Sequence, residues 1–547
     1  MTKPLMKSRR FAPLFWTQFL SAFNDNFLKN ALVFLILFRV ADDSAALVSL
    51  AGAVFIAPFL LLSAAGGQIA DRFDMSLVAR RLKLVEIAGA AVAVTGMALS
   101  SVPVLFAALF IFGVVSALFS PVKYGILPHH LEMDELPRAN AWIEAGTFVS
   151  ILGGTIASGL LFAGEAATLV FAPVMMALAV GCWLVSRAIP ATRAAAPDLR
   201  VDANILRSTW SVLADLARDR RLFRVALMSA WFWVTASVVV ALLPVMVKDL
   251  LGGGETAVTY FLAVFAVSIG IGSAIAAWFC AGRVVLLPAV LGTALVALFG
   301  LDIRFALAGF SGTETPLALA DFLAQPGLTR LTLDMAGLAI AGALLVVPTF
   351  TALQTWAAAD HRARTIAGAN ALGAGAMVTS GIALATAQNL GAGVPAIMTV
   401  LAALNAIAAV AMFKTLPTSP FRDLVSIIYR AFFRMEVKGL ENLEKAGEAP
   451  ILALNHVSYL DAAMALTLTD RKPTFAIDYH VARKPWIKPF LKLANALPVN
   501  PTRPMATRSL IKVVNAGEPM AIFPEGRITV TGSLMKVYDG AAMVEDA

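Results

Sequence analysis

The chain has 547 residues, of which 59% are hydrophobic and only 14% are charged, and its mean hydropathy is +0.79. This composition excludes a soluble globular protein as well as a disordered or fibrous one, and it indicates an integral membrane protein. In a soluble protein the net charge of +8 would suggest a nucleic-acid partner. Beside apolar spans, however, Lys and Arg set the membrane topology and face anionic headgroups, so we predict no nucleic-acid partner. The two cysteines lie far apart in apolar stretches, which indicates neither a disulfide framework nor a metal site.

Twelve apolar runs are long enough to cross a bilayer as helices, since roughly 20 apolar residues span its hydrocarbon core. We therefore expect an α-helical membrane protein. Its spans are expected near 14–38, 47–70, 84–101, 103–121, 141–163, 168–187, 225–247, 257–280, 284–303, 332–356, 365–388 and 393–413. The first run follows four cations, as in a signal peptide, but it contains polar residues and no small-residue cleavage site, so we interpret it as a retained helix.

Lys and Arg are distributed unevenly over the expected loops. With a cytoplasmic N-terminus, the cytoplasmic segments contain 21 of these residues and the opposite segments contain 4. Because cytoplasmic loops carry the excess of positive charge, we predict a multi-pass protein of the cytoplasmic membrane with both termini cytoplasmic.

The longest basic stretch, 187–224, separates the sixth and seventh runs and is interpreted as a linker between two six-helix halves. A short repeat supports the halves. The tripeptide Ala-Asn-Ala occurs around Asn140, at the start of the fifth run, and around Asn370, at the start of the eleventh. Each copy follows a basic loop and precedes a helix rich in small residues, which indicates an internal repeat.

The segment 67–72 follows the second run and reads Gly-Gln-Ile-Ala-Asp-Arg. It resembles the Gly-x-x-x-Asp-Arg signature of the major facilitator superfamily, whose two halves rock about a central site. At the N-terminus of a neighbouring helix, Asp71 would be stabilised by the dipole and by an arginine in one transporter state only. We therefore interpret Gly67, Asp71 and Arg72 as a conformational gate. The alternative is a basic loop that only orients the helix.

Polar residues interrupt the first run. Gln18, Ser21, Asp25 and Lys29 follow steps of three and four residues and so lie on one helical stripe. Charges inside a bilayer cost about 3 kcal/mol or more unless they face a cavity or a partner, so this stripe should point inward. A headgroup or coupling-ion site is then predicted at Asn24, Asp25, Asn26 and Lys29. The alternative is a structural clasp in which Asp25 and Lys29 pair with each other.

The polar first run, the segment 67–72 and the Ala-Asn-Ala helices together resemble the bacterial lysophospholipid transporters of the major facilitator superfamily. The resemblance implies a twelve-span major facilitator fold in two six-helix halves over residues 1–416. It also implies inward movement of a lysophospholipid across the bacterial inner membrane. Composition alone indicates a transporter and leaves other cargoes open, including sugars, drugs and metabolites.

The chain changes character after Lys414, where no further run is long enough to span a membrane. Segment 421–434 has the spacing of an amphipathic helix and is interpreted either as lying on the membrane surface or as a core helix. We therefore expect a linker helix over 417–437 and a soluble cytoplasmic α/β domain over 438–547.

The strand-like segment 449–454 leads into Asn455, His456, Ser458 and Asp461. A carboxylate at this spacing can hold the imidazole in one tautomer and stabilise the imidazolium, while His456 takes a proton from a substrate hydroxyl. The hydroxyl oxygen would then attack a thioester carbonyl without a Ser or Cys nucleophile. The His–Asp spacing alone is common by chance, and Asn455 and Ser458 make the pattern much more specific.

A second strand-like segment ends in Phe523-Pro524 and is followed by Glu525, Gly526 and Arg527. Arg527 can bind a lipid phosphate bidentately, and Gly526 lets backbone amides approach it. The alternative, an ordinary Pro-Gly turn, is less favoured because the segment follows His456 in the same domain.

Both motifs resemble the first and third blocks of the glycerolipid acyltransferases, which make phosphatidic acid and reacylate lysophospholipids. The resemblance implies that His456 is the general base and Asp461 its partner. It further implies substrate contacts, which would come from Asn455, Ser458, Glu525, Gly526, Arg527 and, less regularly placed, Arg503. The acyl donor would be an acyl-carrier-protein or coenzyme A thioester, with no bound cofactor or metal.

The order of the two parts resembles bacterial fusions in which an acyl-carrier-protein synthetase domain follows the acyltransferase. We expect the acyltransferase domain to be incomplete here, because the family's closing strand is missing after Gly540. The expected function is inward transport of lysophospholipid coupled to its reacylation, with membrane lipids and acyl carrier protein as partners. The alternatives are a transporter of another small molecule with an inactive tail that binds a membrane or a partner, and an enzyme whose helices are only an anchor.

Overall fold

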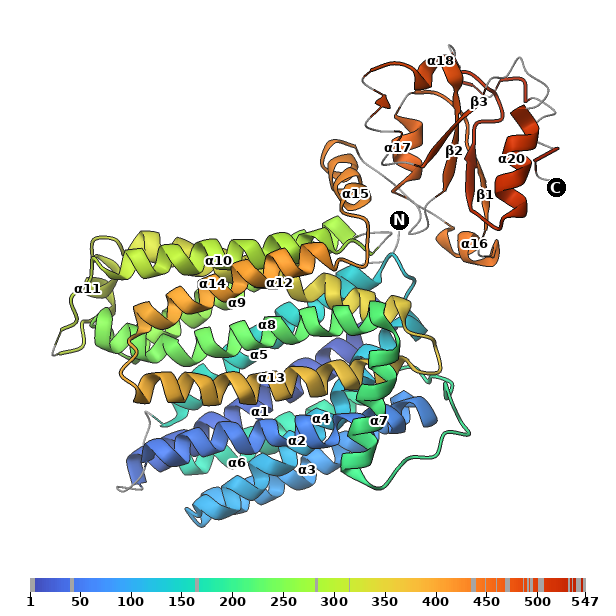
Figure 1. Ribbon diagram of the computed structural model, residues 1–547. Coiled ribbons are helices and arrows are strands. Elements are labelled where there is room, and N and C mark those ends of the chain that lie inside the picture. The colour runs from blue at the N-terminus through green and yellow to red at the C-terminus, as the bar shows by residue number, and fades with distance from the viewer. Residues whose placement is uncertain are drawn as a thin grey trace. The chain divides into compact units, whose positions relative to one another are not determined.

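The computed structural model describes residues 5–39, 44–162, 167–280, 284–313 and 315–433, and parts of 439–544 (Figure 1). The described parts of that last region are 439–447, 449–458, 460–467, 473–485, 487–488, 491, 495–499, 506–529, 532–533, 535–537 and 543–544. The chain forms two compact units, which are treated separately below: residues 1–278 with 288–417, and residues 279–287 with 418–547.

Long helices build the first unit, because a helix satisfies its own backbone groups where lipid offers no hydrogen-bond partners. They are α1 (Ala12–Arg39), α2 (Ser44–Arg72), α3 (Met75–Ala98), α4 (Val102–His130), α5 (Leu136–Phe162), α6 (Ala167–Ser186), α8 (Arg220–Val245), α9 (Glu255–Cys280), α10 (Leu287–Leu307), α12 (Leu328–Trp356), α13 (Arg362–Asn389) and α14 (Val394–Lys414). Each overlaps one of the expected runs. Within the described residues, ten helices are long and apolar enough to span a membrane, and α1 and α3 are not among these ten.

The start of α3 differs from the expectation near residue 84. The helix begins at Met75 because the side chain of Asp74 accepts hydrogen bonds from the amides of Ser76 and Leu77 and so caps it. Lys83, counted with the loop cations in the sequence, therefore lies within a helix and is fully buried.

The basic stretch 187–224, interpreted as a linker between the two halves, contains the helix α7 (Ile205–Arg218). Its buried side includes Val212 and Leu216, which lie against Gly368 of α13. The link between the halves is therefore packed on the bundle. Three short helices complete this unit: η1 (Leu5–Lys7), η2 (Met246–Leu250) and α11 (Leu319–Leu323).

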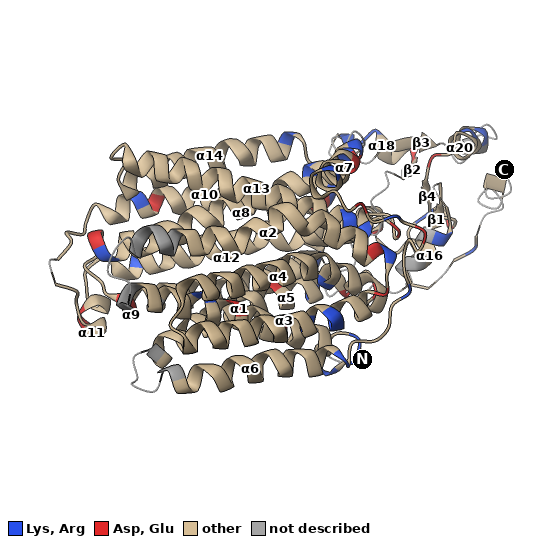
Figure 2. Ribbon diagram, turned by 90° about the horizontal axis from the view of Figure 1, so that it is seen from below, with Lys and Arg blue, Asp and Glu red and all other residues tan. Residues whose placement is uncertain are grey.

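Lys and Arg residues gather at one end of the bundle, and few lie at the end that carries α11 (Figure 2). We call the first of these the basic end. It is the end at which α2 finishes with Arg72 and α13 begins with Arg362. The two ends therefore differ in charge as the sequence predicts.

The second unit is an α/β domain, as expected. Its helices are α15 (Pro420–Phe432), α16 (Leu440–Lys445), α17 (Asp461–Ala465), α18 (Tyr479–Ala482) and α20 (Ala506–Asn515). The strands are β1 (Ile451–Ala453), β2 (Thr474–Asp478), β3 (Ala496–Val499) and β4 (Met520–Ile522), and they form a parallel sheet in the order β1-β4-β2-β3. One side of the sheet packs on α17 and the other on α20.

The strand order explains how the two acyltransferase motifs meet. β1 and β4 are neighbours, and Ala453 lies opposite Ile522 at their carboxyl ends. Because both strands run in the same direction, the loops that leave them start side by side, at the sheet edge where α/β proteins place their ligands.

Candidate functional site

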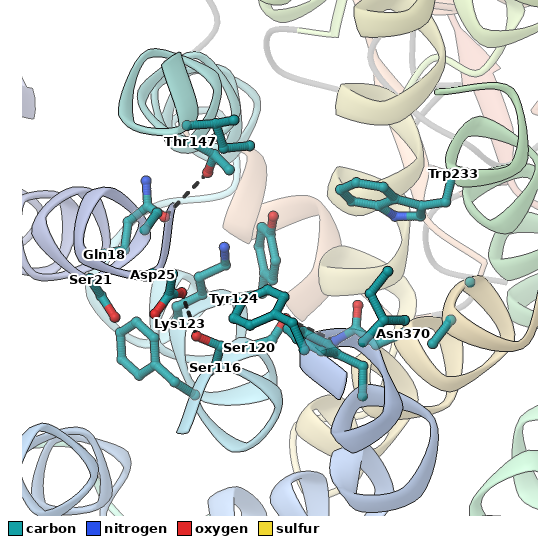
Figure 3. A pocket seen from close by; sticks show the side chains of 18 of the residues that line it. Gln18, Ser21, Asp25, Ser116, Ser120, Lys123, Tyr124, Thr147, Trp233 and Asn370 are labelled. Carbon is teal, nitrogen blue, oxygen red and sulfur yellow. Dashed lines mark hydrogen bonds between the residues drawn. The ribbon is translucent and has the colours of Figure 1, made fainter. Parts of the chain in front are cut away.

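A cavity of about 240 Å³ lies between the two halves of the bundle (Figure 3). Helices α1, α2, α4 and α5 of the first half and α8, α12 and α13 of the second half contribute to its wall. The polar and charged side chains of the wall are Gln18, Ser21, Asp25, Asn26, Ser116, Ser120, Lys123, Tyr124, Glu144, Thr147 and Asn370. Apolar side chains of α2 complete it, together with Trp233 and Phe350. The cavity is thus both charged and apolar.

The two carboxylates of the cavity accept hydrogen bonds from neighbouring hydroxyls, and its cation contacts an aromatic ring. Asp25 accepts a hydrogen bond of 2.7 Å from the hydroxyl of Ser116 on α4. Glu144 accepts one of 2.5 Å from the phenol of Tyr124, and the ammonium of Lys123 lies 4.7 Å from the centre of the Tyr124 ring. Two carboxylates and one cation therefore face a small volume, where each is available to a charged cargo.

The structure separates the four predicted transport residues. Asp25 and Asn26 line the cavity, and the side chain of Asn26 also donates to the carbonyl of Ala22. Asn24 is fully buried and, like Lys29, is not part of the cavity wall as described. In the described part of the chain, Asp25 accepts a hydrogen bond from Ser116 and makes no direct ion pair with Lys29, although its charge acts on that ammonium. The clasp therefore stays an alternative.

The first half contains a buried ion pair that the sequence analysis did not predict. The ammonium of Lys83 lies 2.7 Å from a carboxylate oxygen of Glu86 and 2.6 Å from the hydroxyl of Ser21, and both charged side chains are fully buried. The ammonium also lies 4.1 Å from the centre of the Phe119 ring. The available signal was Glu86 inside an apolar run, since charges within spans face partners or cavities.

The predicted gate lies where α2 ends and α13 begins. The carboxylate of Asp71 accepts hydrogen bonds from the backbone amides of Ala363 (3.0 Å) and Arg364 (3.2 Å), and from the Arg364 guanidinium (2.9 Å). It is fully buried at the N-terminus of α13, where the helix dipole favours an anion. Arg72, in contrast, stacks on the ring of Phe73 at 5.2 Å.

Gly67 permits this contact between the halves. A Cβ at this position would lie 2.6 Å from the Cβ of Ala367 and 2.9 Å from the carbonyl oxygen of Ala363. Only a residue without a side chain therefore lets α2 and α13 approach so closely.

The asparagines of the two Ala-Asn-Ala repeats both reach the opposite half. Asn140 of α5 donates to Gln354 (2.7 Å) and Thr351 (3.2 Å) of α12, and Asn370 of α13 donates to Ser120 of α4 (3.0 Å). The repeat therefore corresponds to equivalent contacts made once from each half.

In the second unit, His456 and Asp461 meet as the motif predicts. Nδ1 of His456 lies 3.2 Å from a carboxylate oxygen of Asp461, and the same oxygen accepts from the amides of Val457 (2.6 Å) and Ser458 (2.7 Å). The carboxylate is thus fixed by two amides, and no hydrogen bond to Nε2 of His456 is found among the described residues. The imidazole stacks on the ring of Phe523 with 4.1 Å between centroids.

Glu525 connects the two motifs. It is 1% exposed, and its carboxylate accepts from the amides of His456 (3.1 Å) and Met535 (3.1 Å). Thr529 returns a hydrogen bond of 2.7 Å from its amide to the carbonyl of His456. The expected contact of Glu525 with a phosphate does not match this geometry, because its carboxylate is engaged in holding the His456 loop.

The remaining predicted substrate contacts lie around this loop. Gly526 has a φ of +63°, in the region that favours glycine, and it presents the exposed Arg527. Asn455 is exposed, and the hydroxyl of Ser458 accepts from the amide of Leu460. Arg503 lies outside the described residues. An exposed guanidinium therefore stands two residues from the carboxylate that positions His456.

Comparisons with known proteins cover both units. Residues 14–337 match the Major Facilitator Superfamily, and residues 434–546 match the Acyltransferase family. Curated relatives named Lysophospholipid transporter LplT, from Yersinia pestis (strain Pestoides F) and Yersinia pseudotuberculosis serotype O:3 (strain YPIII), are 37% identical over 163 residues. This match covers 29% of this chain and 37% of each relative, so the chain spans little more than a third of their length.

Solved structures share the fold of the bundle. The human organic anion transporter MFSD10 has a TM-score of 0.60 at 15% identity, over 75% of this chain and 99% of that chain. The transporter FucP in its outward conformation has a TM-score of 0.56 at 13% identity, over 75% and 99%. Because the superfamily match extends over more than half of the sequence, the chain belongs to the Major Facilitator Superfamily, and it carries a C-terminal domain of the Acyltransferase family.

Proposed function

We propose that this protein moves lysophospholipid inward across the bacterial cytoplasmic membrane and that its C-terminal domain esterifies the free glycerol hydroxyl of that lipid. One observation carries the proposal: a cavity with charged and apolar walls and a His456–Asp461 pair beside an exposed arginine occur in one chain. The name of the curated relatives, lysophospholipid transporter, supports the cargo.

The cavity suits an amphipathic cargo. A lysophosphatidylethanolamine headgroup carries an ammonium and a phosphate, which Asp25 and Lys123 would neutralise, since a charge removed from water needs an opposite charge nearby. The aromatic side chains of Phe55, Phe59 and Trp233 would contact the acyl chain. A sugar presents hydroxyls on most sides and would leave this apolar wall unused.

The charge asymmetry supports the orientation of the bundle in this proposal. Cytoplasmic loops carry the excess of Lys and Arg, so we assign the basic end to the cytoplasm. The contacts of Asp71 with Ala363 and Arg364 join the two halves near that end, and in this proposal they hold it closed. Cargo would enter from the opposite side and leave once these contacts break, because the two states differ in whether this carboxylate is paired.

The acyl transfer would proceed by general base catalysis. Nε2 of His456 takes the proton from the lysophospholipid hydroxyl as its oxygen attacks the thioester carbonyl, and Asp461 stabilises the imidazolium. The tetrahedral intermediate collapses to the new ester, and the thiolate leaves with the proton from His456. Arg527 would bind the lipid phosphate.

The donor in this proposal is an acyl-carrier-protein or coenzyme A thioester, and no bound cofactor takes part, because the chain supplies the base, its partner and the cation itself. Fusion of the two activities would raise the local concentration of imported lipid at His456, as tethering does in general.

The test uses spheroplasts that express the full chain and receive labelled lysophosphatidylethanolamine. We expect the wild type to take up the label and convert it to a two-chain lipid. Asp25→Asn should lower both signals, whereas His456→Ala should keep uptake and lose conversion. His480→Ala is the matched control, because His480 is an exposed histidine of the same domain outside both motifs.

Two results would contradict the proposal. Equal conversion by the wild type and His456→Ala would remove the enzymatic part and leave a transporter with an inactive tail. Equal uptake by the wild type, Asp25→Asn and cells without the protein would remove the transport part.

A further inference from the structure

Helix α15 exposes large apolar side chains on one side. Leu424, Ile428 and Phe432, spaced four residues apart and therefore aligned on the helix, are exposed to 47%, 42% and 79%. We call these three residues the apolar stripe. Another side of the same helix is buried and includes Ser426 and Tyr429. Exposure of these side chains to water is unfavourable, so the apolar stripe is expected to contact a partner.

Two connections fix α15 at the boundary of the membrane. Only five residues, 415–419, separate the end of α14 at Lys414 from the start of this helix at Pro420. The carboxylate of Asp423 accepts hydrogen bonds of 3.0 Å from the amides of Leu286 and Leu287, where the span α10 begins. Short chain segments therefore connect α15 to the ends of two spans, and a helix tethered in this way stays near the headgroups.

The same helix contacts the loop that holds the candidate base. The phenol of Tyr429 donates a hydrogen bond of 2.6 Å to the carbonyl of Leu460, the residue before Asp461. The ring of Tyr429 also lies 5.3 Å from that of Phe433, an exposed residue next to the apolar stripe. The side chain of Leu460 is itself 50% exposed. Apolar surface therefore continues from α15 to the edge of the His456 site.

We propose that the apolar stripe docks into the adjacent phospholipid leaflet and that Tyr429 transmits this placement to the His456–Asp461 loop. The partner is a lipid surface, because the helix is tied at its start to the ends of two spans. The acyltransferase domain would thus take its acceptor directly from the leaflet. The part of this inference that concerns activity rests on the proposed function.

A fluorescent probe tests the docking without any assay of activity. The full chain is reconstituted in phospholipid nanodiscs with an NBD probe on Ile428→Cys or, as the matched control, on Tyr479→Cys, which is also exposed. The native cysteines are both buried. The probe at 428 should shift to the blue and be quenched by doxyl lipids about twofold more strongly than the control, since interfacial helices bury their apolar face about 5–10 Å deep. Equal, water-like emission at both positions would overturn the docking.

Kinetics test the link to activity. Leu424→Ser/Ile428→Ser/Phe432→Ser should raise the KM for lysophospholipid presented in the nanodisc by about tenfold, which corresponds to about 1.4 kcal/mol. It should leave the rate with a water-soluble short-chain lysophospholipid nearly unchanged. Tyr479→Ser/Val537→Ser is the control, because both residues are exposed elsewhere in the domain. Equal losses with both substrates would overturn the link.

Tyr429→Phe separates the positioning role from docking. It should keep the probe at 428 quenched and lower kcat with both substrates, because only the hydrogen bond to Leu460 is lost. An unchanged kcat would contradict the role of Tyr429. A wild-type chain that esterifies neither substrate would overturn the proposed function, whereas the probe result would still decide the docking.

Discussion

The carboxylate of Glu525 accepts a hydrogen bond of 3.1 Å from the backbone amide of His456, although 69 residues separate the two in the chain. The contact exists because β1 and β4 are neighbours in the sheet and their loops start side by side. A buried carboxylate thus fixes the backbone of the candidate base.

Removing this carboxylate should impair acyl transfer without touching the reacting groups. Glu525→Ala leaves the amides of His456 and Met535 unpaired in a buried place, which costs about 1–3 kcal/mol. If the barrier to acyl transfer rises by a comparable free energy, the rate of acyl transfer should fall at least about tenfold. Hydrogen exchange at His456 should rise in parallel. Glu518→Gln, an exposed carboxylate of the same domain, is the control, and normal exchange in Glu525→Ala would contradict the positioning role.

Asp461→Asn should affect the chemistry and leave transport intact. The amide keeps the size of the side chain but cannot stabilise the imidazolium, so acyl transfer should fall by about 100-fold or more. Uptake of labelled lysophospholipid should equal that of the wild type. Unchanged acyl transfer in this variant would mean that His456 acts without its neighbour.

The contact between Asp71 and Arg364 predicts how the basic end opens. Asp71→Asn breaks a buried pair, which costs about 3–5 kcal/mol, and should shift the protein toward a state open at that end. An impermeant maleimide added at the basic end should label Ala374→Cys, on the cavity wall, more than about tenfold faster in that background.

Arg364→Gln provides the cross-check for this contact. It should reproduce the faster labelling, and the double variant should be no faster than either single one, because both remove one shared interaction. Additive effects of the two substitutions would show that the residues act independently.

The buried pair of Lys83 and Glu86 predicts an unequal outcome for single and double variants. Glu86→Leu leaves the ammonium of Lys83 buried without its carboxylate and should destabilise the bundle by about 3–5 kcal/mol. Lys83→Met/Glu86→Leu removes both charges and should recover most of that loss in thermal unfolding. A stable double variant that no longer takes up lipid would assign the pair to transport. A double variant as unstable as Glu86→Leu would contradict the prediction.

Tyr429 predicts a loss of stability at alkaline pH. Its burial and then the negative charge of Asp461 raise the pKa of this phenol above its ordinary value of about 10. The neutral phenol therefore stabilises the fold fully below that ordinary pKa, and this contribution disappears as the pH rises through the higher pKa of the folded protein. Tyr429→Phe should flatten the pH dependence of unfolding above about pH 10. A variant as sensitive to alkali as the wild type would contradict this assignment.

The sequence predicts the helices well because each long apolar run has few alternatives to crossing the membrane. The sequence is less informative about charged residues that are buried by contacts between helices. Lys83 reads as a loop cation because Glu86 and Ser21, which accommodate it, come from the same helix and from α1. The helix α7 was also missed, although the sequence carries its signals: Asn204 caps the helix, and Val212 and Leu216 recur at helical spacing.

In the second unit, His456 and Asp461 are close in sequence, so their contact could be predicted from local geometry. The role of Glu525 could not be predicted, because it depends on the order of the strands in the sheet. β4 is the neighbour of β1 in the sheet, although β2 and β3 lie between them in the chain. The motif identifies Glu525 and Arg527 as neighbours, but the fold determines that Glu525 is buried and Arg527 exposed.

The duplicated asparagines give the contact between the two halves of the bundle a built-in redundancy. Asn140 and Asn370 bridge the same seam from opposite sides, each on its own helix pair. A substitution of one asparagine leaves the hydrogen bonds of the other in place. The contact between the halves should therefore weaken in steps as the two residues are replaced one after the other.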